Sequence, residues 1–201
     1  MSAAREAHLV QLVDETGRTV GQCRVDEAHR PPGRLHRAFS VLLVDPDNRI
    51  LLQQRAAAKT RFPLRWANAC CGHPAPGQSV VDAANRRLGE ELGFGPLTLT
   101  ELGVHVDRAR DAATGRVEHE YDHVLRGDLP TDAPLRLDPA EVAAVRWVTR
   151  DELDDLRRRR PGECAPWLDG VVNLLFPSGS DPVPTGGRAP ASEAPECPGE
   201  R

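Results

Sequence analysis

One segment, Trp66–Gly93, constrains the fold of this chain more than any other part of the sequence. Its second half predicts a helix over Ser79–Leu92, because apolar residues repeat there at helical spacing, namely Val80, Ala84, Leu88 and Leu92. Ser79 and Asp82 form a start that resembles a capping box, and Gly93 provides the usual end. This is the most clearly marked helix in the chain.

Two groups of reactive residues flank this helix. Cys71-Gly72-His73 precedes it, and a cysteine in this setting can act as a nucleophile, an acid/base group or a metal ligand. The helix ends in Glu90-Glu91-Leu92-Gly93, whose carboxylates can hold a magnesium ion that carries a phosphate. Carboxylates are unfavourable at a helix C-terminus, which makes a bound cation there more attractive. Together the two groups favour chemistry on a phosphorylated substrate.

Strands and two further helices account for most of the remaining chain. Apolar runs bounded by turn residues predict strands at His8–Val13, Thr19–Arg24, Ala38–Val44, Arg49–Arg55, Glu101–Asp107, Val117–Arg126 and Val142–Val148. Helices are predicted at Asp151–Arg159 and Trp167–Phe176. Strands mixed with a few helices indicate an α/β protein, an α/β/α sandwich with a mixed sheet.

The chain is long enough, at 201 residues, for one domain with a full core. We expect a flexible N-terminus over residues 1–7, a single domain over residues 8–176, and a disordered tail over residues 177–201. The tail is rich in proline, glycine and serine, a composition that buries too little apolar surface to fold. The oligomeric state stays open at this point, with a monomer favoured.

Charge and cysteine content exclude several classes of function. The net charge of −4 argues against a nucleic-acid partner held by bulk charge. No apolar run is long enough to span a membrane, and the N-terminal residues lack the apolar core of a signal peptide. Five cysteines, an odd number, argue against a disulfide framework, so the expected location is the reducing cytoplasm.

The segment Trp66–Gly93 resembles the Nudix box, in the variant found in type I isopentenyl-diphosphate isomerases. The resemblance extends from about Leu9 to Phe176 and implies a Nudix-like α/β/α sandwich. Two glutamates of the hydrolase pattern are replaced here, by Gln78 and Arg87. Because a cation at Arg87 would repel the metals that a hydrolase uses to activate water, we expect the site to hold one magnesium ion without driving hydrolysis.

The resemblance also implies a site for one divalent metal, Mn²⁺, Zn²⁺ or Mg²⁺. The family ligands fall on three histidines and two glutamates of this chain: His29, His36, His73, Glu118 and Glu120. The two glutamates are two residues apart on a predicted strand, so both carboxylates face the same way. Taken one at a time, each histidine is more simply explained as a surface or capping residue, and only the resemblance joins them. A second site, for the Mg²⁺ that bridges to the substrate, falls on Glu91 and the backbone carbonyl of Cys71.

The reaction that the resemblance implies converts isopentenyl diphosphate into dimethylallyl diphosphate through a tertiary carbocation. Cys71 matches the catalytic cysteine, and Glu120 matches the acid/base group on the other side of the substrate. Trp167 matches the tryptophan that stabilises the carbocation by a cation–π interaction, worth about 2 kcal/mol or more when desolvated. Arg55 and Lys59 match positions that contact the diphosphate. The only partner expected is therefore this small prenyl diphosphate.

One departure from the family concerns a tyrosine whose hydroxyl contacts the catalytic glutamate. Asp107 is the best match for that position, with Arg108 as the alternative, and the only tyrosine, Tyr121, is expected to point away from the site. A side chain at Asp107 that points inward adds a second carboxylate beside Glu120 and lowers the rate. If it points outward, it pairs with a neighbouring arginine.

Two other readings compete with an isomerase. A Nudix hydrolase acting on a nucleoside or prenyl diphosphate is disfavoured by Gln78 and Arg87. A metal-binding scaffold with weak activity is motivated by the missing tyrosine. The full set of matching cysteine, glutamates, histidines and tryptophan argues against that loss.

Overall fold

The computed structural model describes residues 3–176 of the 201-residue chain. The expected disordered tail, residues 177–201, lies outside the described residues. Ala3–Glu6 form a short helix, α1, within the segment that we expected to be flexible. Ion pairs join Arg5 and Glu6 of this helix to the body of the domain.

Nine strands form one mixed sheet around the central strand β3 (His36–Val44). Strand β3 pairs in parallel with β8 (Val117–Asp128) and antiparallel with β1, β4 and β6. The other strands are β1 (Leu9–Val13), β2 (Thr19–Arg24), β4 (Ile50–Arg55), β5 (Trp66–Ala67), β6 (Cys70–Gly72), β7 (Leu99–Arg110) and β9 (Val142–Val148). All seven strands expected from the sequence are present, with shifted ends at several of them. The short strands β5 and β6 were not expected.

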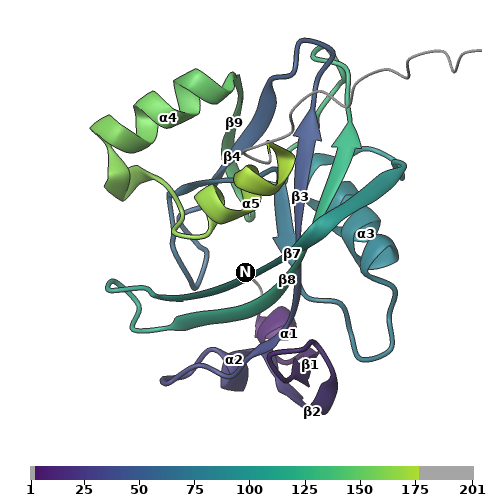
Figure 1. Ribbon diagram of the computed structural model, residues 1–201, viewed down its shortest axis with the longest axis vertical. Helices are drawn as coiled ribbons and strands as arrows, with labels where there is room; N and C mark the ends of the chain where they lie inside the picture. The colour runs from purple at the N-terminus through teal and green to yellow at the C-terminus, as the bar shows by residue number, and fades with distance from the viewer. Residues whose placement is uncertain (1–2, 177–201) are drawn as a thin grey trace, which may run out of the picture.

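Side-chain alternation along β3 builds a core on each face of the sheet. Phe39, Val41 and Leu43 face the core under helix α3 (Val80–Leu92). Leu42 faces the opposite core, under α4 (Arg150–Arg159) and α5 (Leu168–Leu175). Successive residues of a strand point to opposite faces, so a nearly continuous apolar strand contributes side chains to both cores. Figure 1 shows α3 on one side of β3 and α5 on the other, which confirms the α/β/α sandwich.

Helix α3 begins and ends where the sequence predicts. Ser79 is its N-cap and accepts a hydrogen bond from the backbone nitrogen of Asp82. Gly93 ends the helix with φ of 77°, a left-handed conformation that glycine adopts without steric cost. Among the described residues, no helix is long and apolar enough to cross a bilayer.

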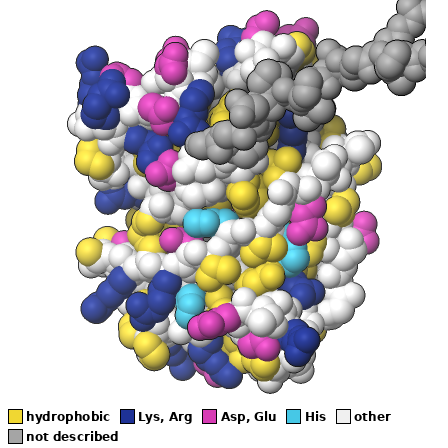
Figure 2. Space-filling view, in the orientation of Figure 1, with side chains coloured by type: hydrophobic (Ala, Val, Ile, Leu, Met, Phe, Trp, Pro, Cys, Tyr) yellow, Lys and Arg dark blue, Asp and Glu magenta, His cyan; other side chains and the backbone are white. Residues whose placement is uncertain are grey.

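A third, smaller core lies at the other end of the molecule, where β1, β2 and the short helix α2 (Val25–Ala28) meet. In Figure 1 these elements and α1 lie below the long β7–β8 ribbon. Figure 2 shows hydrophobic and histidine side chains across the middle of this face, with charged side chains around its edge. The N-terminal elements thus form one wall of the pocket described next.

Candidate active site

Residues from distant parts of the sequence surround one pocket, with about 870 Å³ of empty space including its open mouth. Cys71, Glu118, Glu120 and Trp167 line it. So do five cations, Arg55, Lys59, Arg61, Arg86 and Arg87. The N-terminal elements add Arg5, His8, Leu9 and Val25. A concave pocket of this size with many cations suits a small anionic ligand.

The register of the sheet brings the two expected catalytic groups to one strand. Glu120 on β8 lies beside His36 of β3, and Cys71 on β6 lies beside Ser40 of β3. His36 and Ser40 are four residues apart, so they face the same side of the sheet. Strand β3 therefore sets the spacing between thiol and carboxylate, which come from two strands that are not neighbours in sequence.

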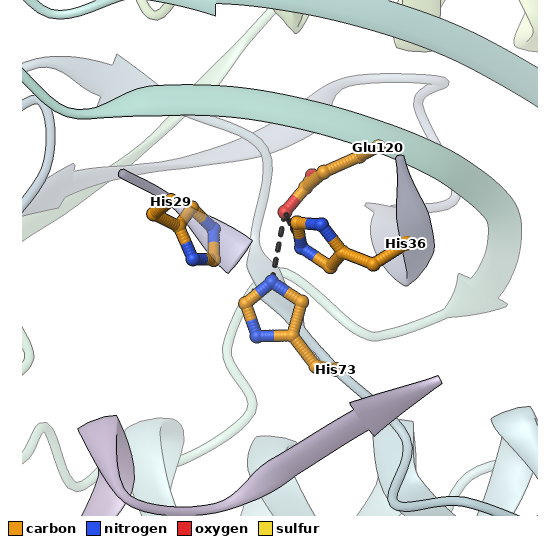
Figure 3. Close-up of side chains that lie close together, drawn as sticks. All are labelled: His29, His36, His73 and Glu120. Carbon is orange, nitrogen blue, oxygen red and sulfur yellow. Dashed lines mark hydrogen bonds and ion pairs between the residues drawn. The ribbon is translucent and has the colours of Figure 1, made fainter. Parts of the chain in front are cut away.

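Three of the expected histidines and one glutamate converge on a common point. One ligand atom from each of His29, His36, His73 and Glu120 lies within 4.8 Å of all the others. The ring centroids are 4.7 to 5.2 Å apart, and Figure 3 shows the four side chains turned toward one another. His73 Nε2 and Glu120 Oε1 are 2.9 Å apart.

Hydrogen bonds to the backbone fix the orientation of two of these rings. His29 Nδ1 lies 2.7 Å from the Val25 carbonyl, and His36 Nδ1 lies 2.7 Å from the Arg34 carbonyl. A carbonyl can only accept, so each Nδ1 donates to its carbonyl and each Nε2 points into the cluster. Both Nε2 atoms are buried, with His29 Nε2 2.7 Å from Glu118 Oε2 and His36 Nε2 3.7 Å from Glu120 Oε1. Buried imidazole nitrogens and carboxylates that meet at one point fit a divalent metal.

Glu118, the fifth expected ligand, lies at the edge of this cluster. Its Oε2 is 2.7 Å from His29 Nε2, and its Oε1 accepts a hydrogen bond from Arg61 Nε at 3.0 Å. Burial opposes ionisation of this carboxyl, but the charges of His29 and Arg61 hold its pKa well below the usual range. Glu118 is thus ionised and shared between the cluster and Arg61.

The protonation states of His73 and Glu120 suit the binding of a cation. Burial lowers the pKa of His73 to about 4, so this ring is neutral near pH 7. Burial and Glu118 oppose ionisation of Glu120, but contacts with His36 and His73 hold its pKa below the usual range. Neutral imidazoles beside ionised carboxylates are the forms that bind divalent metals.

The thiol of Cys71 is protonated in this environment. Burial, followed by the negative charge of Asp122, raises its pKa to about 11. Its Sγ donates to Asn68 Oδ1 at 3.1 Å and lies 3.6 Å from Ser40 Oγ. The neighbouring Cys70 is fully buried and does not line the pocket, consistent with a small core residue.

Trp167 contacts the pocket through a buried indole. Its Nε1 donates to Asn68 Oδ1 at 3.1 Å, and the Phe62 ring meets it edge-on at 5.3 Å between centroids. The Arg55 guanidinium lies 5.4 Å from the indole centroid. The same guanidinium donates to the carbonyls of Arg61 and Phe62, so Arg55 also ties the following loop in place.

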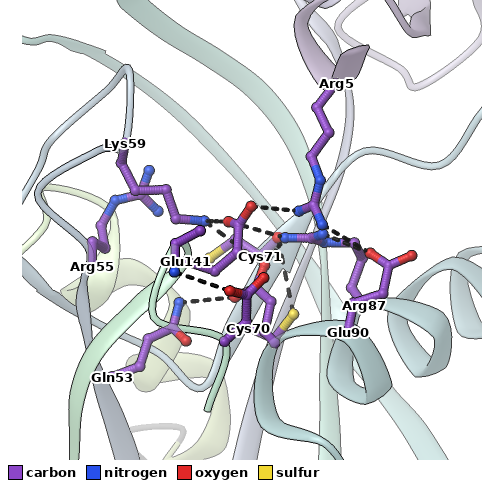
Figure 4. A network of polar contacts seen from close by, with 12 residues as sticks. Arg5, Gln53, Arg55, Lys59, Cys70, Cys71, Arg87, Glu90 and Glu141 are labelled. Carbon is purple, nitrogen blue, oxygen red and sulfur yellow. Dashed lines mark hydrogen bonds and ion pairs between the residues drawn. The ribbon is translucent and has the colours of Figure 1, made fainter. Parts of the chain in front are cut away.

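The second expected metal site contains cations of the protein itself. Glu91 is fully buried, and its carboxylate contacts Arg87, Gln53 and Lys59. Lys59 and Arg87 also contact Glu141, as Figure 4 shows. We name the residues joined in this way the ion-pair network: Arg5, Lys59, Arg87, Glu90, Glu91 and Glu141. Glu91 is thus already neutralised by cations of the protein.

Asp107 faces the site. It lies directly opposite Glu120 in the β7–β8 pairing, and residues directly opposite share a face. Its Oδ2 is buried without a hydrogen-bond partner, and burial raises its pKa. Arg108 instead donates to the Pro32 carbonyl, which settles the alternative of an outward pair with that residue. Tyr121 packs beside Gly17 and the His123 ring, away from the pocket as expected.

Several residues of the site escaped the sequence analysis. Asn68 lies inside the marked segment, three residues before Cys71, but an amide gives no signal of its partners. Glu141 follows an irregular loop, and Arg5 belongs to the segment expected to be flexible. Their positions depend on contacts more than 50 residues away in sequence, such as Arg5 with Glu141 at 2.8 Å. Only the folded chain reveals such contacts.

Comparisons with known proteins agree with this fold. The NUDIX domain profile matches residues 34–168. An isopentenyl-diphosphate Delta-isomerase of Nocardia farcinica is 61% identical over 165 residues, which cover 82% of this chain and 93% of the relative. One from Streptomyces coelicolor is 45% identical over 173 residues, 86% of each chain. The crystal structure of DR0079 from Deinococcus radiodurans shares the fold, with a TM-score of 0.62, 23% identity, and 84% of this chain and 98% of that one covered.

These similarities span most of the chain, and the profile match covers Cys71, His36, His73 and Glu120. Nudix enzymes use divalent metals, and the described residues present a group able to bind one. The chain therefore belongs to the isopentenyl-diphosphate Delta-isomerase family of the Nudix superfamily.

Proposed function

We propose that this protein interconverts isopentenyl diphosphate and dimethylallyl diphosphate, a step of isoprenoid biosynthesis, by proton transfer at Cys71 and Glu120. The observation that carries the proposal is the pairing along β3, which sets a thiol and a carboxylate into one pocket beside the indole of Trp167. Membership of the isomerase family indicates the reaction. The pocket contains groups suited to proton transfer, to carbocation stabilisation and to diphosphate binding.

The chemistry needs one proton added and one removed. A new C–H bond at the terminal carbon of the double bond leaves a tertiary carbocation, and loss of a proton from the neighbouring methylene forms the new double bond. Cys71 and Glu120 are the donor and acceptor on the two sides of the substrate. The electron-rich face of Trp167 stabilises the carbocation.

The six cations that line the pocket suit the diphosphate. Among them Lys59 and Arg55 are the proposed contacts, although Lys59 now pairs with Glu141 and Arg55 with two loop carbonyls. Arg61 is held by Glu118 and Glu6, so it stabilises the pocket wall. Binding of the diphosphate would thus exchange some internal ion pairs for substrate contacts.

His29, His36, His73, Glu118 and Glu120 would hold one divalent ion, Mn²⁺, Zn²⁺ or Mg²⁺. When bound, such an ion supplies positive charge that keeps Glu120 ionised and oriented. Glu91 and the carbonyl of Cys71 would hold the Mg²⁺ that accompanies the diphosphate, and Glu91 would then release Arg87. We further propose that the protein is a monomer and that it is cytoplasmic, a location supported by the four free cysteines of the described chain.

The test is to incubate the purified protein with isopentenyl diphosphate and Mg²⁺ and to measure two products in parallel. An isomerase forms acid-labile allylic diphosphate without releasing phosphate. A hydrolase releases phosphate and forms no allylic diphosphate. Release of phosphate would overturn the proposal. The ion pairs that Arg87 makes with Glu90 and Glu91 argue against hydrolysis.

A further inference from the structure

A buried amide joins the proposed catalytic thiol to the proposed carbocation-stabilising indole. Asn68 is fully buried, and its Oδ1 accepts hydrogen bonds from Cys71 Sγ and from Trp167 Nε1, both at 3.1 Å. Its Nδ2 donates to the carbonyls of Cys70 at 2.8 Å and Val41 at 3.3 Å. All the hydrogen-bonding positions of the amide are therefore in use.

These partners fix which way the amide faces. Two backbone carbonyls can only accept, so the nitrogen must lie on their side. The carbonyl oxygen then faces the pocket, where the thiol and the indole N–H use its two lone pairs. Because one oxygen serves both donors, it sets the position of the thiol relative to the indole ring.

We propose that Asn68 is a positioning residue that holds the Cys71 thiol and the Trp167 indole in register across the reacting carbons. The role rests on the proposed function, because it has meaning only if both groups act on the substrate. A displacement of about 1 Å between reacting groups can cost about 100-fold in rate. A shared anchor that prevents such displacement acts on turnover and leaves diphosphate binding unchanged, since Asn68 does not line the pocket.

A purely structural role is the alternative, since Asn68 also bonds Val41 on β3 and Cys70 on β6. Asn85 provides a matched control. It too is an amide that bridges backbone groups, with Nδ2 to the Leu97 carbonyl at 3.1 Å and Oδ1 from the Leu97 nitrogen at 2.8 Å. It lies on α3 and does not line the pocket. Asn85→Leu therefore removes a structural amide without touching the thiol or the indole.

The experiment compares Asn68→Leu with Asn85→Leu in the full chain. For Asn68→Leu we expect kcat for isopentenyl diphosphate to fall roughly 10- to 100-fold, with KM changed by less than about threefold. Asn85→Leu should keep kcat within about twofold of the wild type, even if its melting temperature falls as much as that of Asn68→Leu. Asn68→Asp, which keeps the acceptor oxygen, should recover part of the lost kcat.

A second readout does not depend on turnover. The chain has three tryptophans, so ¹H–¹⁵N spectra contain three indole signals, and Trp167→Phe identifies the one from Trp167. Loss of the hydrogen bond in Asn68→Leu should shift this signal upfield and leave the other two unchanged. If Asn68→Leu fails to fold, Asn68→Ser replaces it. The serine hydroxyl is one bond closer to the backbone than the amide oxygen, so it cannot accept from both Cys71 and Trp167.

The outcomes separate the two proposals. If the wild type isomerises the substrate but the Asn68 variant keeps kcat within twofold, or leaves the Trp167 signal in place, the positioning role is wrong. A fall in kcat that Asn85→Leu reproduces overturns it as well. If the wild type forms no allylic product, the proposed function fails first, and the positioning role falls with it.

Discussion

The histidine cluster and the ion-pair network lie in the same pocket region, and both contain buried carboxylates. In the histidine cluster, imidazole nitrogens and the Glu120 carboxylate meet at one point, and Arg61 reaches only the edge of the cluster, through Glu118. In the network, three carboxylates (Glu90, Glu91 and Glu141) meet three cations (Arg5, Lys59 and Arg87). The difference shows how a buried charge is stabilised, by an expected metal in one place and by the protein's own side chains in the other.

This contrast has a consequence for metal binding. An ion entering the histidine cluster meets preorganised ligands and displaces no protein cation. An ion that binds Glu91 must first compete with Arg87 and Lys59. We therefore expect one metal to bind tightly without substrate, and a second to bind only together with the diphosphate, which can take over the released cations.

The largest effect is expected at the groups that exchange protons. Glu120→Gln and Cys71→Ala should each lower kcat by about 100- to 10,000-fold, the range for loss of a general acid or base. Cys70→Ala is the matched control, because Cys70 is adjacent in sequence but does not line the pocket. Steady-state kinetics decide the matter. Near wild-type turnover in Cys71→Ala would remove the basis of the proposed mechanism.

Metal removal should separate the two regions directly. Dialysis against a chelator should abolish isomerisation, and added Mn²⁺ or Mg²⁺ should restore it. By elemental analysis of the substrate-free protein, His36→Ala should lose about one equivalent of metal, whereas Glu91→Gln should lose none. Equal metal content in both variants would show that the cluster and the network do not differ as we describe.

Arg87 tests the network from the other side. Arg87→Met removes one of three cations and leaves Glu91 with Lys59 and Gln53. We expect the free energy of unfolding to fall by about 1 to 3 kcal/mol, because a buried carboxylate loses its main partner. Denaturant unfolding measures this loss. Added Mg²⁺ should restore more stability in this variant than in the wild type, and an equal response in both would argue against competition at Glu91.

The smallest effect is expected at Asp107. Burial raises its pKa from the ordinary value of 3.8, so ionisation of this carboxyl costs stability at neutral pH. Asp107→Asn should therefore stabilise the protein by less than about 1 kcal/mol at pH 7, since the residue is only half-buried. The gain should vanish below the unfolded pKa and be complete above the raised folded pKa. Melting temperatures at pH 3.5 and pH 7 test this sign, and a gain only at low pH would contradict it.

The sequence predicts the site well where local pattern and family resemblance coincide. Helix α3 has its caps, Ser79 and Gly93, where turn chemistry places them, and Glu118 and Glu120 share a face because a strand repeats every two residues. The convergence of His29, His36 and His73 was expected only from the resemblance. Nothing in the spacing of these residues indicates it, because His29 follows α2, His36 begins β3 and His73 follows β6, and only the folded sheet brings these elements together.

What the sequence could not predict consists of contacts between side chains that have no local signal. Asn68 becomes informative only when Trp167, 99 residues away, comes within hydrogen-bond distance. The partners of Glu91 are of the same kind, because a helix-end carboxylate looks the same whether it binds a metal or an arginine. Helix α1 was missed since its order derives from ion pairs with the domain, and its four residues are too few to be helical alone.

Helix α1 also matters for anyone who purifies this enzyme. Arg5 lines the same pocket as His73, one of the imidazoles expected to bind a divalent cation. A polyhistidine tag fused before Met1 would be joined to the chain only a few residues before Arg5. Such a tag, and the nickel used to capture it, can compete for the same ions. A tag placed after Arg201 and a nickel-free first assay would avoid mistaking an affinity-resin metal for the native one.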